Sequence, residues 1–295
     1  MKDTAKGTIQ YVIPKPDVSR ADPSAVALFK KCFDGKNSHQ VANFLSSFSK
    51  NMVAYSDATL GWKVPGWQAL HDLLEQYMPN WGNGVSYPTR ILAGATSALV
   101  AVTDTPELFG GEIHALACVD FHDGEIVRWI DYWDSATFAP EVLASMTASA
   151  QIFPGDLGES AVSGSAEAAI ESACTRLHDE LDQGARDVAN LLTYDVVYED
   201  MTARVQLIGR SEVSGYLRRT IGLLPFGPGA EILHVVGGIA GGGYEWTGTS
   251  ESNVPRGISA IELDDSAAIS RITTVYDSAR FGQASCQNLR DAVVD

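Results

Sequence analysis

Apolar residues recur along the chain with two different spacings, and these spacings follow the same order in both halves. Residues 26–45 and 169–181 carry them at the three-to-four spacing of an amphipathic helix. A short strand, a further helix and a run of strand-like segments follow each helical stretch. Helices followed by such a run predict an α+β fold with a mostly antiparallel sheet. In the first half we expect the strands of the run at about 86–94, 97–105, 112–122 and 125–134.

An internal repeat relates the two halves. The sequence VAYSDAT at residues 53–59 returns as VVYEDMT at 196–202, a displacement of 143 residues. The same displacement relates DSATF at 134–138 to DSARF at 277–281, so one spacing holds over about 80 residues. A repeat of this kind indicates two copies of one structural unit.

The repeat predicts two domains and a linker. The first domain covers residues 22–147 and the second covers 164–282, with an N-terminal extension at 1–21 and a C-terminal tail at 283–295. Residues 148–163 between them are rich in glycine, serine and alanine, which is typical of a flexible linker. A chain of 295 residues agrees with two domains of ordinary size.

Charge and composition restrict the partners and the location of the protein. The formal net charge is −16, which excludes nucleic acids and anionic membrane surfaces as partners because both require a positive patch. No apolar run reaches the roughly 20 residues that span a bilayer. The N-terminus lacks the apolar core of a secretory signal, so we expect a cytoplasmic protein. The four cysteines lie far apart without a CxxC or Cys/His cluster, and we expect reduced thiols and no metal site.

The strand VRWIDYWD carries the most distinctive candidate chemistry. Side chains alternate across a strand, so Trp129, Asp131 and Trp133 share one face. A carboxylate between two indoles is poorly solvated in its charged form, which should raise the pKa of Asp131 and make it a candidate for proton transfer. The alternative is a structural carboxylate that caps a loop or pairs with Arg128 or Arg90.

These residues resemble a known family. The segment HDGEIVRWIDYWDSATF is similar to the last strand of limonene epoxide hydrolase and its SnoaL-like relatives, in which a tryptophan stands two residues before an aspartate that aromatic residues follow. Each half is thus similar to a nuclear-transport-factor-2-like domain of the SnoaL-like kind. The resemblance implies two tandem domains, each a curved antiparallel sheet around a cone-shaped pocket that N-terminal helices cover. Such domains include hydrolases, cyclases, isomerases, dehydratases and binding modules, so the resemblance leaves the activity open.

The resemblance also implies roles for individual residues. Asp131 is similar to the aspartate that activates water in the epoxide hydrolase, and Tyr55 and Asp57 stand at the tyrosine and asparagine positions that help to hold this water. The hydrolase has an Arg-x-Asp pair on a middle strand, whereas this chain has VTDT there, with Asp104 as a candidate acid and no arginine. A slip of one residue in the alignment would point Asp104 outwards. An aspartate at position 57 suggests an alternative in which Asp57 and Asp131 share one proton.

Several candidates also have structural interpretations. Asp57 ends a strand, where an aspartate often only forms a turn, and Tyr55 is as readily a core residue. His114 would serve as a base near neutral pH if it faces the pocket, although strand histidines are more often structural. Asp134 and Asp277 each precede a helix, and we interpret both as helix N-caps.

The second copy differs from the first where the chemistry is expected. Tyr198 and Asp200 remain in it, but the central acid and both indoles are replaced. We therefore predict an active pocket in the first domain and a degenerate one in the second. Domains of this kind commonly pair through the outer face of the sheet, which implies a pseudo-dimer within one chain and leaves a further homodimer open. The tryptophans of the first copy that are candidates for binding substrate are Trp62, Trp67, Trp129 and Trp133.

The predicted function is acid–base catalysis on a small, apolar or polyketide-like molecule, without a cofactor. Asp131 would activate water or act as the base, Tyr55 and Asp57 would position an oxygen atom, and Asp104 or His114 would supply the proton. Epoxide opening, by water or by an internal hydroxyl, is the first reaction. Cyclisation or isomerisation of a ketone through an enolate is the alternative, and a module that binds a ligand or scaffolds a partner without catalysis is the second alternative.

Overall fold

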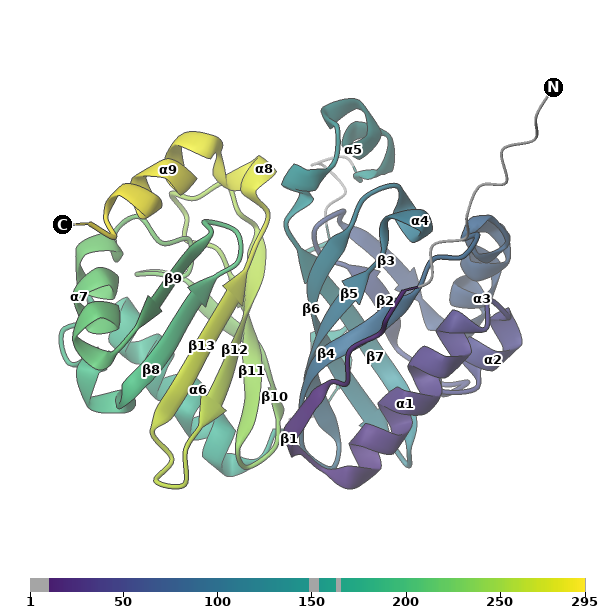
Figure 1. Cartoon of the computed structure of the whole chain (residues 1–295), viewed down its shortest axis with the longest axis horizontal. Coiled ribbons are helices and arrows are strands. Elements are labelled where there is room, and N and C mark those ends of the chain that lie inside the picture. Colours follow the sequence, from purple (N-terminus) through teal and green to yellow (C-terminus); the bar gives the residue numbers. More distant parts are fainter. Residues whose placement is uncertain (1–10, 149–153, 163–165, 295) are drawn as a thin grey trace.

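Two curved sheets with their helices lie side by side in the protein (Figure 1). The computed structural model describes residues 11–148, 154–162 and 166–294. The predicted α+β class is confirmed, and most neighbouring strands are antiparallel. Some residues of the predicted extension, linker, second domain and tail lie outside the described residues. These are residues 1–10, 149–153, 163–165 and 295.

The first sheet has seven strands in the order β1-β4-β5-β6-β7-β2-β3. They are β1 (Asp17–Ala21), β2 (Ala54–Asp57), β3 (Trp62–Pro65), β4 (Ser86–Ala93), β5 (Ser97–Asp104), β6 (Ile113–His122) and β7 (Glu125–Trp133). The helices of this half are α1 (Pro23–Asn37), α2 (Val41–Leu45), α3 (Gly66–Tyr77), α4 (Pro106–Phe109) and α5 (Pro140–Met146). Figure 1 shows α1, α2 and α3 on the side of this sheet that faces away from the second sheet.

The second sheet has six strands in the order β10-β11-β12-β13-β8-β9. They are β8 (Leu192–Asp200), β9 (Val205–Ile208), β10 (Glu231–Gly237), β11 (Gly241–Thr247), β12 (Arg256–Leu263) and β13 (Ile269–Val275). The helices of this half are α6 (Ala168–Asp182), α7 (Arg210–Thr220), α8 (Ser278–Phe281) and α9 (Gln283–Asp291). Apart from β1, which adds a parallel edge strand to β4, both sheets follow one strand order, so the sheet topology repeats as the sequence does.

Helix α1 shows how the sequence brings a polar group into the first half. Asp22 accepts a hydrogen bond from the backbone of Ser24 at 2.7 Å, and proline follows at the first helical position, where its missing N–H costs nothing. Phe29 and Phe33 are buried one turn apart on the face toward the sheet. Lys36 follows three residues later on the same face and is therefore buried as well.

The faces of the two sheets that point away from their helices pack against each other. On β7, Trp129 joins the core beneath α1, whereas Ile130 joins an apolar layer shared with the second sheet. This layer draws on strands of both sheets; its members include Leu99, Leu116, Ile130, Val236, Ile258 and Val275. Strand alternation thus gives each sheet one face for its own interior and one for the contact between the halves.

Buried charges cross this contact. Nη2 of the fully buried Arg128 donates to Oε2 of Glu245 at 2.7 Å, and the hydroxyl of Tyr132 donates to the other oxygen at 2.6 Å. Burial alone would raise the pKa of Glu245, but the charges of Arg128 and Arg256 outweigh it and lower that pKa to about 2. Arg128 therefore serves the contact between the halves and is not the partner of Asp131.

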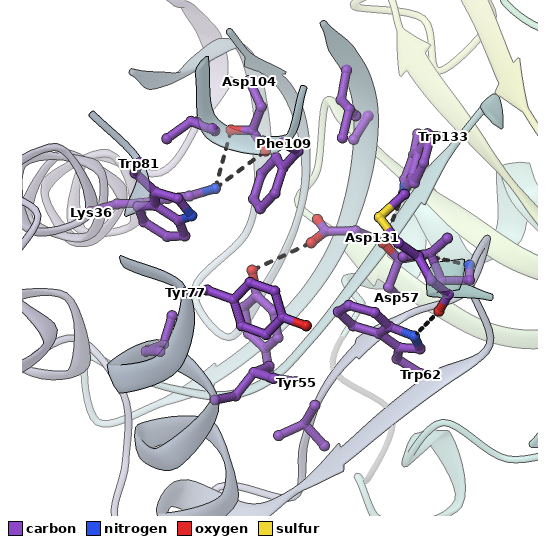
Figure 2. A pocket seen from close by; sticks show the side chains of 18 of the residues that line it. Lys36, Tyr55, Asp57, Trp62, Tyr77, Trp81, Asp104, Phe109, Asp131 and Trp133 are labelled. Atoms are coloured by element: carbon purple, nitrogen blue, oxygen red, sulfur yellow. Dashed lines mark hydrogen bonds and ion pairs between the residues drawn. The ribbon is translucent and has the colours of Figure 1, made fainter. Parts of the chain in front are cut away.

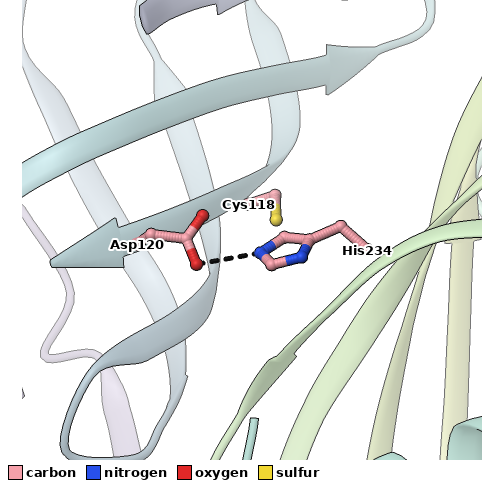
Figure 3. Close-up of side chains that lie close together, drawn as sticks. All are labelled: Cys118, Asp120 and His234. Carbon is pink, nitrogen blue, oxygen red and sulfur yellow. Dashed lines mark hydrogen bonds and ion pairs between the residues drawn. The ribbon is translucent and has the colours of Figure 1, made fainter. Parts of the chain in front are cut away.

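Cys118, Asp120 and His234 also meet at this contact (Figure 3). The sequence has no Cys/His cluster, but β6 and β10 bring these residues together although they are distant along the chain. Nε2 of His234 lies 2.9 Å from Oδ1 of Asp120. The guanidinium of Arg128 lies 3.4 Å from both the sulfur of Cys118 and Oδ2 of Asp120, so a cation already contacts these atoms. In the described residues all four cysteines are buried and free.

The predicted N-caps are confirmed, and they add a symmetric contact between the halves. Asp134 and Asp277 each accept a hydrogen bond from the backbone N–H two residues further on. Asp134 also accepts from the backbone of Ser278 at 3.0 Å, and Asp277 accepts from the backbone of Ser135 at 3.3 Å. Equivalent residues thus exchange equivalent bonds, as in an isologous interface.

No helix in the ranges that the structure describes is long and apolar enough to cross a membrane.

Candidate functional site

A cavity of about 310 Å³ lies inside the first half, between its sheet and its helices. The lining is largely apolar and rich in aromatic rings, and Figure 2 shows the polar side chains that interrupt it. Such a cavity, with a few convergent polar groups, is the usual form of a site for a small organic molecule. The aromatic lining residues are Tyr55, Trp62, Tyr77, Trp81, Phe109, Trp133 and Phe138, and the charged ones are Lys36, Asp57, Asp104 and Asp131.

Asp131 faces this cavity from β7. Oδ1 accepts a hydrogen bond from the indole N–H of Trp129 at 2.7 Å, and Oδ2 lies 3.5 Å from the hydroxyl of Tyr55. Burial raises the pKa of Asp131 to about 7, with the charge of Lys36 acting against the rise and the charge of Asp57 adding to it. The predicted direction of the shift is confirmed, although Trp129 contributes a hydrogen bond to the carboxylate as well as an apolar surface.

Tyr55 supports Asp131 from the neighbouring strand β2. Its ring stacks on that of Trp129, with the centroids 6.3 Å apart and the planes inclined by 16°. Burial, together with the charge of Asp131, raises the pKa of Tyr55 well above its ordinary value, so this phenol is a hydrogen-bond donor at neutral pH. The structure thus brings Tyr55 and Asp131 together as predicted.

Asp57 also lines the cavity, but both of its oxygens are engaged by the protein. Oδ1 accepts from the backbone of Leu60 at 2.8 Å and Oδ2 from the indole of Trp133 at 2.8 Å. Burial raises its pKa to about 6. In the second half, Asp200 accepts from a backbone N–H at 2.7 Å and from the hydroxyl of Tyr276 at 2.9 Å. The same arrangement in both halves indicates that Asp57 holds the turn after β2.

Asp57 and Asp131 do not form the pair that we considered. They lie opposite each other on the parallel strands β2 and β7. Each takes its hydrogen bonds from other groups, and among the described residues no hydrogen bond joins the two carboxyls. The alternative in which they share one proton is therefore corrected, and their interaction is limited to the effect of one charge on the other.

Lys36 is the polar residue of the cavity that the sequence did not reveal. Its ammonium nitrogen lies 3.1 Å and 3.4 Å from the two carboxylate oxygens of Asp104, at the end of β5. The rings of Trp81 and Phe109 flank it, each with its centroid 6.0 Å from the nitrogen. The pair also shows that Asp104 points inwards, which the alignment had left open. A signal was present, since Lys36 continues the buried face of α1.

Two predicted residues lie away from the cavity. His114 points to the opposite face of β6, because its neighbours Ile113 and Ala115 line the cavity and side chains alternate. Its Nε2 lies 2.8 Å from Glu112, and the side chain is exposed. Trp67 stacks on His71 along α3 and is not part of the cavity lining. The expectations that His114 supplies a proton and that Trp67 binds substrate are therefore corrected.

Two of the other candidate tryptophans line the cavity, and the third lies behind Asp131. Trp62 and Trp133 line the cavity, and the indole of Trp62 donates to the backbone oxygen of Met146 at 2.6 Å, which ties β3 to α5. Trp129 lies behind Asp131 and packs against Phe29 and Phe33 of α1. Its contribution to the site is the hydrogen bond to Asp131.

Comparisons with known proteins place parts of the chain beside several solved structures. No family model matches the sequence, and no curated protein matches it. A steroid delta-isomerase from Pseudomonas aeruginosa is similar over 45% of this chain and 93% of its own, with 17% identity and a TM-score of 0.35. A nuclear-transport-factor-2-like protein of unknown function from Cytophaga hutchinsonii is similar over 36% of this chain and 87% of its own, with 12% identity and a TM-score of 0.31.

A SnoaL-like protein of unknown function from Burkholderia thailandensis is similar over 37% of this chain and 95% of its own, with 10% identity and a TM-score of 0.32. The structural neighbours thus include steroid-isomerase, nuclear-transport-factor-2-like and SnoaL-like proteins. Each of these three covers less than half of this chain.

The interior of the second half is packed with aromatic rings. Tyr198 and Tyr216 lie with their ring centroids 5.6 Å apart, and Phe226, Trp246 and Tyr276 contact one another at 5.3 to 6.3 Å. All five are buried. The residue in the place of Asp131 is Thr274, whose hydroxyl donates to a backbone oxygen within the sheet. The charged groups that line the cavity in the first half thus have no counterpart at the place of Asp131, and a packed core of aromatic rings fills the second half.

Proposed function

We propose that the protein is an enzyme that moves a proton at the carbon next to a carbonyl group of a small, largely apolar ketone, without a cofactor. The observation that carries this proposal is Asp131, a carboxyl with a pKa of about 7 that faces an apolar cavity and accepts hydrogen bonds from neutral donors. A carboxylate with a pKa near the working pH is a strong base that is still ionised in part, which suits the deprotonation of a carbon acid.

The reaction has two proton-transfer steps. The carboxylate of Asp131 takes a proton from the α-carbon, so a C–H bond breaks, an O–H bond forms, and the electron pair moves to the carbonyl oxygen to give an enolate. In an isomerisation, Asp131 returns the proton to another carbon of the conjugated system. In a cyclisation, the enolate carbon instead attacks a second carbonyl of the substrate, and the resulting alkoxide takes up the proton. Neither path needs an oxidant or a reductant.

Epoxide opening ranks below enolate chemistry. It requires an acid that protonates the leaving oxygen, and Asp104 was the candidate for this role. Asp104 forms an ion pair with Lys36 and so acts as a carboxylate, which is not a proton donor. His114, the other candidate, lies outside the cavity. A module that binds an apolar ligand without turnover would use the same cavity but would not depend on the basicity of Asp131.

Exchange of α-hydrogens for deuterium tests the proposal without knowledge of the natural substrate. A panel of cyclic β,γ-unsaturated ketones and β-diketones is incubated with the protein in D₂O, and deuterium uptake is followed by NMR. We expect exchange above the uncatalysed rate for at least one ketone, and a loss of roughly 100-fold to 10,000-fold in Asp131→Asn.

The second half supplies a matched control. Asp200 is also buried with a pKa raised to about 7 by burial, but it lies in the packed core, so Asp200→Asn should exchange the ketone like the wild type. Equal exchange by Asp131→Asn and the wild type would overturn the proposal. Diol formation from an epoxide that requires Asp131, with no ketone exchanged, would replace it by epoxide hydrolysis.

A further inference from the structure

The cavity has a second polar group besides the base. Lys36 and Asp104 enter it from α1 and β5, whereas Asp131 and Tyr55 enter it from β7 and β2 (Figure 2). Lys36 is 8% exposed, so the positive charge is largely withdrawn from solvent, and its surroundings are the rings of Trp81 and Phe109. A charge in such surroundings acts on a neighbouring group more strongly than it would in water.

Lys36 retains hydrogen-bonding capacity. An ammonium group has three N–H donors, and in the described residues the hydrogen bonds of this nitrogen go to the single carboxylate of Asp104. A remaining donor can therefore serve an oxygen atom of a molecule in the cavity that Lys36 lines. The charge also acts across the cavity, because it lowers the pKa of Asp131 against the effect of burial.

The second half shows that this fold forms without such a pair. Strands β11 and β12 of the second half correspond to β5 and β6. Thr247 of β11 lies opposite the first residue of β12, as Asp104 of β5 lies opposite the first residue of β6, so a threonine stands in the place of Asp104. When α6 is aligned with α1 so that Leu181 takes the place of Lys36, each buried position of α6 falls on a buried position of α1. Both members of the pair are thus replaced in the half whose described interior is a packed core, together with Asp131. A pair needed only for the fold would not be lost with the base.

We propose that Lys36 donates a hydrogen bond to the carbonyl oxygen of the substrate and stabilises the negative charge that this oxygen gains when Asp131 takes the α-proton. This inference rests on the proposed function and narrows the substrate to an apolar ketone whose carbonyl oxygen reaches Lys36 while its acidic carbon reaches Asp131. Lys36 keeps its proton in this step, since the donated hydrogen stays on nitrogen. Asp104 is a positioning residue that holds the ammonium group in place.

A bound naphthol tests this assignment independently of turnover. Naphthol is an apolar molecule whose ionised oxygen resembles an enolate, and its ionised form absorbs at longer wavelength than its neutral form. Its binding is followed by the quenching of tryptophan fluorescence, and its ionisation in the complex by absorbance as a function of pH. All variants carry Asp131→Asn as well, so that the opposite carboxylate does not titrate.

The comparison of four proteins separates the charge of Lys36 from its structural contact. Lys36→Met alone would leave Asp104 buried without its partner, so the decisive variant is Lys36→Met combined with Asp104→Asn. We expect the pKa of bound naphthol to be higher in this double variant than in the parent by roughly 1 to 3 units. Asp104→Asn alone should leave the pKa of bound naphthol near that of the parent. Lys30 is an exposed lysine of the same helix, and Lys30→Met should leave this pKa unchanged.

Failure of this inference differs from failure of the proposed function. Equal ionisation of naphthol in the parent and the double variant, or no binding of naphthol to the parent, overturns the role of Lys36. With Asp131 restored, the double variant should lose roughly 100-fold in ketone exchange. Exchange that needs Asp131 but persists undiminished in the double variant overturns the role of Lys36 and leaves the base in place.

Discussion

The two halves of the chain share a framework and differ in what fills it. In both, an aspartate at the end of a strand holds the following turn. The hydroxyl of Thr59 bonds to both backbone groups of Trp133, and that of Thr202 bonds to both backbone groups of Tyr276. Asp57 and Asp200 are therefore part of the framework. The groups to which we assign chemistry differ together: Lys36, Asp104 and Asp131 stand where the second half has Leu181, Thr247 and Thr274.

This difference separates residues that the fold needs from residues to which we assign a function. The shared bonds of Asp57 and Asp200 recur because the turn requires them, whatever the interior contains. Asp131 and the ion pair of Lys36 and Asp104 occur only beside the cavity, where burial of charge costs stability and gives no gain to the framework. A loss of stability from buried charge that occurs in one half and not in the equivalent place of the other is typical of a functional site.

The packed interior and the cavity should respond differently to the loss of a large ring. Trp246 is fully buried in the second half, so Trp246→Ala should lower the free energy of unfolding by roughly 3 to 5 kcal/mol. Trp62 is partly exposed and borders the cavity, so Trp62→Ala removes fewer contacts and should cost less. Urea unfolding of both variants measures the difference, and equal losses would contradict a filled second interior.

The two carboxyls with a pKa of about 7 should affect stability in the same direction but to different extents. Burial raises the pKa of Asp200 to about 7, against roughly 3.9 in an unfolded chain, so the native state holds this proton more tightly. Protonated Asp200 stabilises the fold fully below about pH 4, and this contribution is lost as the pH rises to about 7. Asp200→Asn should remove this dependence, so its stability relative to the wild type should increase by a few kcal/mol over that range.

Asp131→Asn provides the comparison for this effect. The pKa of Asp131 is also raised to about 7 by burial, but its side chain is partly exposed to the cavity, where water can solvate the charge. Its substitution should therefore change the pH dependence less. Urea unfolding at about pH 5 and pH 8 measures both variants. A flat difference for Asp200→Asn would show that this carboxyl is solvated in the native state.

The strand pattern predicted much of the first sheet, and together with the resemblance it pointed to Asp131. Strands expected at 86–94, 97–105 and 125–134 are present as β4, β5 and β7 within one residue at each end. Alternation along β7 grouped Asp131 with Trp129 and Trp133 on one face, and the resemblance implied that this face lines a pocket. The sequence left open which face of its strand His114 occupies, and the structure puts it on the face of β6 away from the cavity.

What the sequence could not provide was contact between distant segments. The spacing of α1 put Lys36 on its buried face, but the partner of Lys36 lies on a strand 68 residues further on, so nothing local marked Asp104 as that partner. Cys118 and Asp120 meet His234 only because the two sheets pack together. Strand β1 was likewise missed, since five residues with little alternation form a strand there only through pairing with β4.

The smallest expected effect concerns the symmetric contact between the halves. Asp134 and Asp277 each cap a helical turn and accept hydrogen bonds from a serine of the other half, so replacement of either by alanine should cost more than the loss of a cap alone, which is typically ~1 kcal/mol. Asp22→Ala is the matched control, because Asp22 caps α1 with a bond inside its own half.

If the halves are related by a twofold axis, the losses for Asp134→Ala and Asp277→Ala should agree within ~0.5 kcal/mol, and both should exceed that for Asp22→Ala. Thermal unfolding of the three variants measures this order. Equal losses at all three positions would mean that the bonds between the halves contribute nothing beyond the caps. Unequal losses at Asp134 and Asp277 would mean that the repeat has lost its symmetry at the contact as well as in the interior.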